Sequence, residues 1–276
     1  MSRHRFVRRT LPALVGLGLV PALAQGQAAP QPPVTIFLSD HAANLPTAAT
    51  LRDGTFQFEI SHRFGPPVSE GADALFGFDG PVINRIGLSM GVSDEVTVGV
   101  LRSNLSDNLE FNAKARVGQG GGGSMPFMVA LKGGLAFNTQ LPDAPGIDGS
   151  EPQWYGQVIL NGKVGSDLAI GVVPTVLGNP DIDAEEKGTT VSVGVNGQLY
   201  LTRRTSLLAE WIFSEEQTNR PYDSGTFGVE MRVGGHFFKL VLTNQQFMNP
   251  TQHLTGASRK FEPDEWRVGF NITRRF

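Results

Sequence analysis

The sequence predicts an all-β fold, a closed antiparallel transmembrane β-barrel of about 12 strands. Three observations lead to this prediction. Twelve short segments alternate apolar and polar residues, the last segment ends on Phe276, and tight and long connections alternate along the chain. A strand with one apolar and one polar face that runs to a C-terminal aromatic residue is typical of the closing strand of bacterial outer-membrane barrels. The apolar face would then meet lipid, and the polar face would line the inside.

The first residues have the features of a secretory signal peptide, with four arginines before the apolar core Leu11–Val20. The pair Arg8 and Arg9 also allows a twin-arginine signal, although the rest of that motif is poor. We expect cleavage, export, and both barrel termini in the periplasm. The predicted parts are a signal peptide (1–24), a periplasmic N-terminal segment (25–51) and the transmembrane barrel (52–276).

Composition excludes several classes of protein. Cleavage after residue 24 lowers Lys and Arg from 23 to 19 and leaves Asp and Glu at 26, so the mature chain has a formal charge of −7. A nucleic-acid-binding protein would carry a basic excess instead. The chain has no Cys, which excludes disulfides, thiolate metal sites and a Cys nucleophile. We expect no cofactor and no metal site.

The alternating segments are each about as long as a strand that crosses a bilayer at a tilt. The first six apolar faces are Phe56, Phe58 and Ile60; Ile86, Leu88, Met90 and Val92; Val96, Val98 and Val100; Leu109, Phe111, Ala113, Ala115 and Val117; Phe127, Val129, Leu131, Leu135 and Phe137; and Trp154, Val158 and Leu160. The last six are Leu168, Ile170, Val172 and Val176; Val191, Val193, Val195, Leu199 and Leu201; Leu207, Ala209, Trp211 and Phe213; Phe227, Val229, Met231 and Val233; Phe238, Leu240 and Leu242; and Trp266, Val268, Phe270, Ile272 and Phe276.

The connections support the same fold. Tight turns are expected at Ser93-Asp94, Gly165-Ser166, Arg203-Arg204 and Gly234-Gly235, and most other connections are longer and polar. Short turns at one end and long loops at the other are typical of an outer-membrane barrel. Two connections, 104–107 and 118–124, fit this alternation less well, so ten or fourteen strands stay possible. A soluble β-sandwich also alternates, but without this order of turns.

Three stretches resemble one family of bacterial β-barrels: GTFQFEISHRFG (Gly54–Gly65), LFGFDGPVINRIGLSMGVSDEVTVGVLRS (Leu75–Ser103) and FKLVLTNQQFMNPTQ (Phe238–Gln252). On these residues the chain resembles the DUF5777-type proteins, and with the strands between them the resemblance covers most of the mature chain. It implies an outer-membrane barrel. It implies no activity, because the family has no assigned function.

The polar positions of the strands predict the lining of the barrel. Nine of them are cations, namely Arg63, Arg85, Lys114, Arg116, Lys132, Lys163, Arg232, Lys239 and Arg267. Four are anions, namely Glu59, Glu110, Glu210 and Glu230. Charges in lipid are costly, so their place on the polar face supports the assignment of inside and outside. Five excess positive charges would favour anions in a water-filled lumen.

These charges leave two functional hypotheses open. The first is a narrow pore or binding barrel for small anionic solutes. The second is a non-conducting structural or partner-docking barrel with a plugged lumen, whose segment Val34–Leu51 or outer loops engage another envelope protein. Under both hypotheses, the expected partners are outer-membrane lipid and the barrel-assembly machinery. The machinery would bind the C-terminal strand. We expect no enzyme, because no nucleophile and base are arranged for catalysis.

Three further patterns favour structural interpretations. Gly118, Gly120 and Gly123 spell G-x-G-x-x-G, but an alternating strand follows where a dinucleotide site needs a helix. Ser61 and His62 are adjacent and would point to opposite faces of a strand, with His62 at the membrane interface. Four acidic residues of one long loop lack a full calcium-loop pattern and favour a solvated loop: Asp181, Asp183, Glu185 and Glu186.

Overall fold

The computed structural model describes residues 35–121, 125–140, 152–181, 188–215 and 219–276. The chain separates into two units, residues 1–33 and 34–276, and every described residue belongs to the second. The signal peptide expected over residues 1–24 therefore lies outside the described residues.

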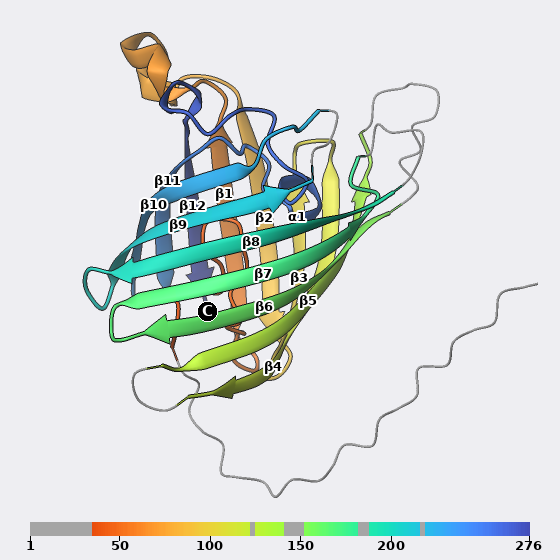
Figure 1. Ribbon diagram of the computed structural model, residues 1–276, viewed down its shortest axis with the longest axis vertical. Coiled ribbons are helices and arrows are strands. Elements are labelled where there is room, and N and C mark those ends of the chain that lie inside the picture. The colour runs from red at the N-terminus through yellow and green to blue at the C-terminus, as the bar shows by residue number, and fades with distance from the viewer. Residues whose placement is uncertain (1–34, 122–124, 141–151, 182–187, 216–218) are drawn as a thin grey trace, which may run out of the picture. The chain divides into compact units, whose positions relative to one another are not determined.

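Twelve antiparallel strands close into one barrel (Figure 1). Each strand pairs with its neighbours in sequence, and β1 closes the sheet against β12, with Gln57 opposite Arg275 and Arg63 opposite Gly269. The predicted barrel and its number of strands are confirmed. The strands are β1 (Phe56–Phe64), β2 (Val82–Gly91), β3 (Val96–Ser103), β4 (Asn108–Gly120), β5 (Phe127–Asn138), β6 (Gln153–Val164), β7 (Leu168–Gly178), β8 (Thr189–Tyr200), β9 (Thr205–Ser214), β10 (Ser224–Val233), β11 (His236–Thr243) and β12 (Arg267–Arg275).

The outside of the barrel is apolar and the inside is polar, as the alternation predicts. In β3 the valines face outward, whereas Thr97 and Ser103 are buried inside. Large apolar side chains stay open on the outside, with Leu88 60% and Leu240 56% exposed. Soluble monomers rarely show apolar patches of this extent, because contact between apolar surface and water is unfavourable. The outer surface is therefore suited to lipid acyl chains.

The connections differ between the two ends of the barrel. At one end, called the short-turn end, the connections are brief, for example 165–167 between β6 and β7 and 234–235 between β10 and β11. At the other, called the long-loop end, residues 65–81 join β1 to β2 and residues 244–266 join β11 to β12. These loops carry the 3-10 helices η1 (Val68–Gly77) and η2 (Pro263–Glu265) and the helix α1 (Pro250–His253). Within the described residues, no helix is long and apolar enough to cross a membrane.

The glycine-rich stretch after residue 117 belongs to a strand. β4 runs on to Gly120 past an irregularity in register between Arg116 and Gly118, and β5 follows. This extension shortens the connection to β5, so it fits the short-turn end better than the sequence suggests. Gly118 and Gly120 therefore belong to the sheet and open no helix, and Gly123 lies outside the described residues.

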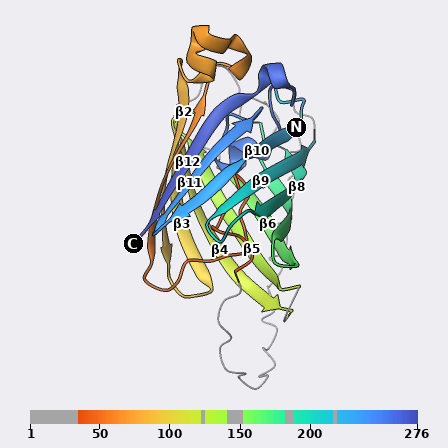
Figure 2. The same ribbon diagram turned by 90° about the vertical axis from the view of Figure 1, so that its left-hand side faces the viewer.

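Two parts of the chain lie inside the barrel and form its core. The first is residues 35–51, here called the N-terminal segment, which precede β1. Figures 1 and 2 show it in red between the strands of the barrel. The second is residues 244–257, here called the β11–β12 insert, which contain α1 and enter from the long-loop end. Both are almost wholly buried.

Candidate functional site

The charged residues predicted to line the lumen are on the inner face of the wall. Five of the nine cations are buried inside it: Arg63, Arg85, Lys114, Lys239 and Arg267. All four predicted anions are buried too: Glu59, Glu110, Glu210 and Glu230. They do not face an empty channel, because the N-terminal segment and the β11–β12 insert occupy the space between them.

The N-terminal segment covers an apolar patch on the inner wall. Its side chains of Ile36, Phe37, Leu45 and Ala48 pack in one cluster with inward residues of the wall and with Leu254 of the insert. The wall residues in this cluster are Met128, Ala130, Tyr155, Ile159, Ala169, Val173, Leu177 and Ile212. Without the segment much of this patch would face water, so burial stabilises the segment inside the barrel.

Glu210 of β9 holds a turn of the N-terminal segment. Its carboxylate accepts the backbone N–H groups of Ala43, Asn44 and Leu45 at 2.9–3.1 Å. It also accepts the Asn44 side-chain amide at 2.7 Å. The side-chain oxygen of Asn44, Oδ1, accepts a hydrogen bond from the guanidinium of Arg63 of β1 at 2.9 Å. Backbone groups taken out of water need such partners, and a charged acceptor gives the strongest ones.

Further side chains of the wall pair with the backbone of the segment. Lys114 donates from Nζ to the carbonyl oxygens of Asp40 (3.2 Å) and Thr47 (3.0 Å). The Ala48 N–H donates to Oδ1 of Asn161 at 2.6 Å. Contacts of the same kind are Leu38 N–H to Gln198 Oε1 (2.8 Å), Leu51 N–H to Thr97 Oγ1 (2.8 Å) and Asn271 Nδ2 to the Ala43 carbonyl oxygen (2.7 Å). The lumen is thus a specific binding site for this segment.

Gly194 of β8, which has no side chain, leaves room for Leu45 against the wall. A Cβ on Gly194 of β8 would lie 2.5 Å from a methyl group of Leu45, closer than real contacts allow. Leu45 is fully buried. The segment therefore fits the wall by shape as well as by hydrogen bonds.

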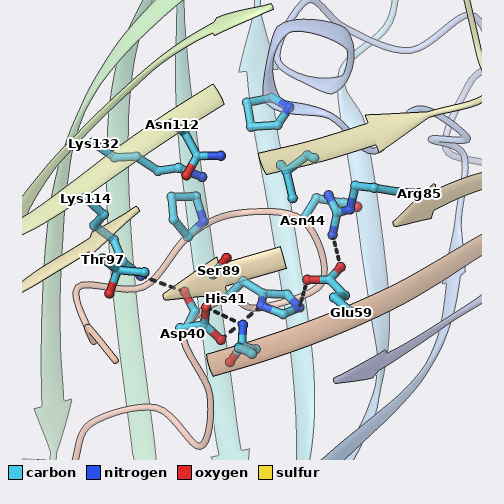
Figure 3. A pocket seen from close by; sticks show the side chains of 14 residues that line it. Asp40, His41, Asn44, Glu59, Arg85, Ser89, Thr97, Asn112, Lys114 and Lys132 are labelled. Atoms are coloured by element: carbon cyan, nitrogen blue, oxygen red, sulfur yellow. Dashed lines mark hydrogen bonds and ion pairs between the residues drawn. The ribbon is translucent and has the colours of Figure 1, made fainter. Parts of the chain in front are cut away.

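Asp40 and His41 of the segment join the charges of the wall (Figure 3). The Asp40 carboxylate accepts hydrogen bonds from Gln57 (2.9 Å) and Arg275 (3.1 Å), and His41 Nδ1 is 3.3 Å from it. Burial by itself would raise the pKa of Asp40. The hydrogen bond to His41 and the charges of His41, Arg275 and Lys114 outweigh it and hold that pKa well below its usual range.

Arg85 of β2 connects the wall to the β11–β12 insert. Its guanidinium forms an ion pair with Glu59 of β1 and donates to the carbonyl oxygen of Met248 in the insert. His253 of α1 is fully buried, with Nδ1 3.1 Å from the carbonyl oxygens of Met248 and Asn249. Burial lowers the pKa of His253 to about 3, and the charge of Arg85 adds to this effect. The imidazole is therefore neutral at pH 7.

A small polar cavity is left where wall, segment and insert meet (Figure 3). Its volume is about 60 Å³. Asp40 and His41 line it from the segment, and Pro250 lines it from the insert. The charged wall residues around it are Glu59, Arg85, Lys114 and Lys132.

The other predicted cations lie away from this cavity. Arg116 bonds to the Asp94 carbonyl oxygen at the short-turn end (3.2 Å), where Lys163 and Arg232 also lie. Arg267 donates to the carbonyl oxygens of Gly65 and Glu265 at the long-loop end. Lys239 lies 3.4 Å from Glu230 and donates to Ser39 of the segment. The structure therefore brings Arg85, Lys114 and Lys132 together at the cavity, places Arg63 on Asn44 and Asn271, and spreads the others along the barrel.

Two further residues singled out in the sequence, Ser61 and His62, lie on opposite faces of β1. Ser61 donates to Glu59 inside the barrel (2.6 Å), whereas His62 packs outside against Phe270 with ring centroids 4.5 Å apart. Of the acidic loop, Asp181 is described and Asp183, Glu185 and Glu186 lie outside the described residues. Within the described ranges, no three His, Cys, Asp or Glu side chains form a group that could hold a metal ion.

A family model described as a membrane bound beta barrel domain (DUF5777) matches residues 37–276. The chain belongs to this family. The DUF5777 match confirms the resemblance seen in the sequence and includes the N-terminal segment from Phe37 onward. Together with the closed barrel and its apolar outer surface, it makes this chain a membrane-bound β-barrel, the architecture of bacterial outer-membrane proteins. No curated protein matches the chain.

Solved structures share the barrel architecture at low identity. The KdgM porin aligns with a TM-score of 0.47 and 7% identity, over 80% of this chain and 98% of that chain. The COG4313 outer membrane channel from Pseudomonas putida F1 aligns with a TM-score of 0.49 and 11% identity, over 83% and 98%. LpxR from Salmonella typhimurium aligns with a TM-score of 0.37 and 9% identity, over 80% and 99%. These likenesses concern the fold and carry no argument about activity, so the absence of an enzymatic function stays a prediction.

Proposed function

We propose that this protein is a gated outer-membrane channel for small anionic solutes, closed in the state described here, with the N-terminal segment as its gate. One observation carries the proposal: the segment lies in the lumen, beside the β11–β12 insert, without joining the sheet. Its backbone is held by side chains such as Glu210, Lys114 and Asn161. These contacts can break while the barrel stays closed on itself through β1 and β12.

The wall charges support the solute class. The segment carries one carboxylate, Asp40, and leaving the lumen would take that negative charge out of it. The wall would keep the nine predicted cations and the four predicted anions. An open lumen with this excess of positive charge prefers anions.

The orientation is part of the proposal. With the short-turn end in the periplasm, the N-terminal segment would enter the lumen from the periplasmic side, because the Tyr200 hydroxyl at the short-turn end of β8 donates to the Ile36 carbonyl oxygen (2.5 Å). We also propose that the barrel-assembly machinery recognises the closing strand β12 together with Phe276.

The test is ion conductance of the refolded protein in a planar bilayer, with three variants. Gly194→Leu fills the space that Leu45 occupies and should shift the segment out of the lumen. Overpacking of this kind costs about 1–3 kcal/mol, which is about a 5- to 150-fold rise in the ratio of open to closed protein. Gly197→Leu is the matched control, because Gly197 faces outward on the same strand, where a Cβ meets only ordinary contacts.

The third variant closes the gate covalently. Ala48→Cys with Asn161→Cys places two thiols at a contact between segment and wall, in a chain that has no other Cys. A short bis-methanethiosulfonate reagent, which forms a mixed disulfide with each thiol and releases methanesulfinate, should abolish current through the Gly194→Leu background. We expect rare openings for the unmodified protein, frequent anion-selective openings for Gly194→Leu, and none for the cross-linked form. A folded Gly194→Leu barrel as silent as the unmodified protein would overturn the gate.

The apolar patch on the inner wall favours a second candidate, a permanently plugged barrel that serves as a structural or docking protein. Ile159, Val173 and Ile212 would face water in an open lumen. Such exposure is unfavourable and would hold the segment in place. Silence of the folded Gly194→Leu barrel in the bilayer is the result that this candidate predicts.

A further inference from the structure

We propose that the cavity between wall, segment and insert is a binding site for one small oxyanion, with Lys132 as its main ligand. This site exists in the closed barrel and does not require the gate to open. It goes beyond the proposed channel, because it assigns a bound anion to the state described here.

The lining of the cavity offers donors that have no partner. Among the described residues, no hydrogen bond is found for the ammonium group of Lys132 or the hydroxyl of Ser89, and both residues line the cavity. Nε of Arg85 is buried without a hydrogen bond. The hydroxyl of Thr97 accepts the Leu51 N–H and keeps its own proton to donate.

The carboxylates around the cavity already accept several hydrogen bonds. Oε1 of Glu59 is paired with Arg85 and accepts the Ser61 hydroxyl, whereas Oε2 lies 3.7 Å from Nε2 of His41. The Asp40 carboxylate accepts hydrogen bonds from Gln57 and Arg275. The lining therefore offers more free donors than free acceptors, which suits a ligand that only accepts hydrogen bonds.

The net charge of the residues that line the cavity also favours an anion. Three cations, Arg85, Lys114 and Lys132, face two carboxylates, Asp40 and Glu59. Within the described part of the chain, Lys132 forms no hydrogen bond; its Nζ lies 5.8 Å from the ring centroid of Tyr155, and the carboxylate that attracts it most strongly is Glu110, which does not line the cavity. A charged group removed from bulk water is costly until an opposite charge pairs with it. One bound anion would neutralise the excess charge.

The volume limits the size of the ligand. A water molecule needs about 10–15 Å³ of a cavity measured in this way. The cavity of about 60 Å³ therefore holds about four to six waters, or one oxyanion of similar size. Phosphate, sulfate and acetate meet this limit, whereas citrate is too large while the segment stays in place.

The test is calorimetric titration of the folded full-length protein in detergent with inorganic phosphate, sulfate, acetate and citrate. Lys132→Met removes the proposed main ligand, and Ser89→Ala removes a second donor. Lys163→Met is the matched control, because Lys163 is a half-buried wall lysine away from the cavity. Gel mobility with and without heating shows that each variant has folded as a barrel.

We expect one phosphate per chain, at least about tenfold weaker binding for Lys132→Met, and unchanged binding for Lys163→Met, because a hydrogen bond to a charged group is lost in the first only. Ser89→Ala should weaken binding by less, and it tests the site even if Lys132→Met does not fold. Absence of saturable binding, equal binding by Lys132→Met, or citrate binding as tight as phosphate would overturn the site. If phosphate binds as expected but the barrel never conducts, the proposed gate is wrong and the oxyanion site stands.

Discussion

Replacing Glu210 by Gln tests how the N-terminal segment is held in the lumen. The substitution keeps the size of the side chain and removes its negative charge. Four donors converge on the Glu210 carboxylate: three consecutive backbone N–H groups and the Asn44 side chain. The amide of a glutamine has one acceptor oxygen, so it cannot serve all four donors.

The size of the effect follows from these contacts. A hydrogen bond to a charged group contributes about 1.5–3 kcal/mol, and a buried donor left without a partner costs about 1–3 kcal/mol. The glutamine oxygen can still accept some of these hydrogen bonds. We therefore expect the free energy that holds the segment in the lumen to fall by about 2–4 kcal/mol. That loss corresponds to about a 30- to 700-fold larger fraction of protein with the segment released.

Labelling of a single cysteine measures this fraction. Ala48→Cys places a thiol on the segment at a position that is fully buried, in a chain with no other Cys. A maleimide reaches this thiol only when the segment leaves, so its labelling rate reports the released fraction when return is fast. The matched control is Glu110→Gln, because the buried carboxylate of Glu110 bonds to Tyr155 and Asn112 of the wall.

We expect the labelling rate to rise for Glu210→Gln and to stay near the parent value for Glu110→Gln. Equal rates for Glu210→Gln and its parent, in protein shown to be a folded barrel, would refute the role of Glu210. A rise of the same size for Glu110→Gln would show that any lost wall carboxylate loosens the barrel, and the specific contact would lose its support.

Two further predictions concern the β11–β12 insert. Arg85→Met should destabilise the barrel by about 3–5 kcal/mol, because it leaves the buried Glu59 carboxylate without its ion pair. Adding Glu59→Gln should restore much of the lost stability. Urea unfolding in detergent measures the stability of both variants. Acidification should loosen the insert as the pH falls below about 6.5, the ordinary pKa of histidine. The pKa of His253 in the folded state is about 3, so the unfolded insert binds the proton more tightly across this interval and stability falls with pH. The rate of protease cleavage within residues 244–257, measured between pH 7 and pH 4, reports this loosening. His253→Gln should remove the pH dependence of the cleavage rate.

Much of the fold was predictable because it depends on a local pattern. A strand in a barrel has one face to lipid and one to the interior, so its residues alternate with a period of two that can be read without knowing the partners. The positions of the twelve strands, the closing strand ending near Phe276 and the inward face of Glu59, Arg85 and Glu230 followed from this period alone. The short connection at 104–107 was predicted with the bounds that the structure shows, whereas the extension of β4 to Gly120 required the structure, because bulges leave a weaker signal.

The contents of the lumen were harder to predict. The sequence marks residues 34–38 as a short apolar run and the stretch that follows as a loop or helical turn, and neither shows that the chain enters the barrel. Asp40, His41 and Asn44 were therefore missed as parts of the site. One signal was available: Ile159, Val173 and Ile212 are apolar on the inward parity, which an open, water-filled channel does not need.

The sequence by itself determined a membrane barrel and its inside and outside. Only the tertiary structure decided that the inner wall is covered, and by which segment. The physical reason is the range of the interactions. Alternation is set between neighbouring residues, whereas Leu45 meets Gly194 and Asn44 meets Glu210 only after closure of the barrel brings parts more than a hundred residues apart into contact.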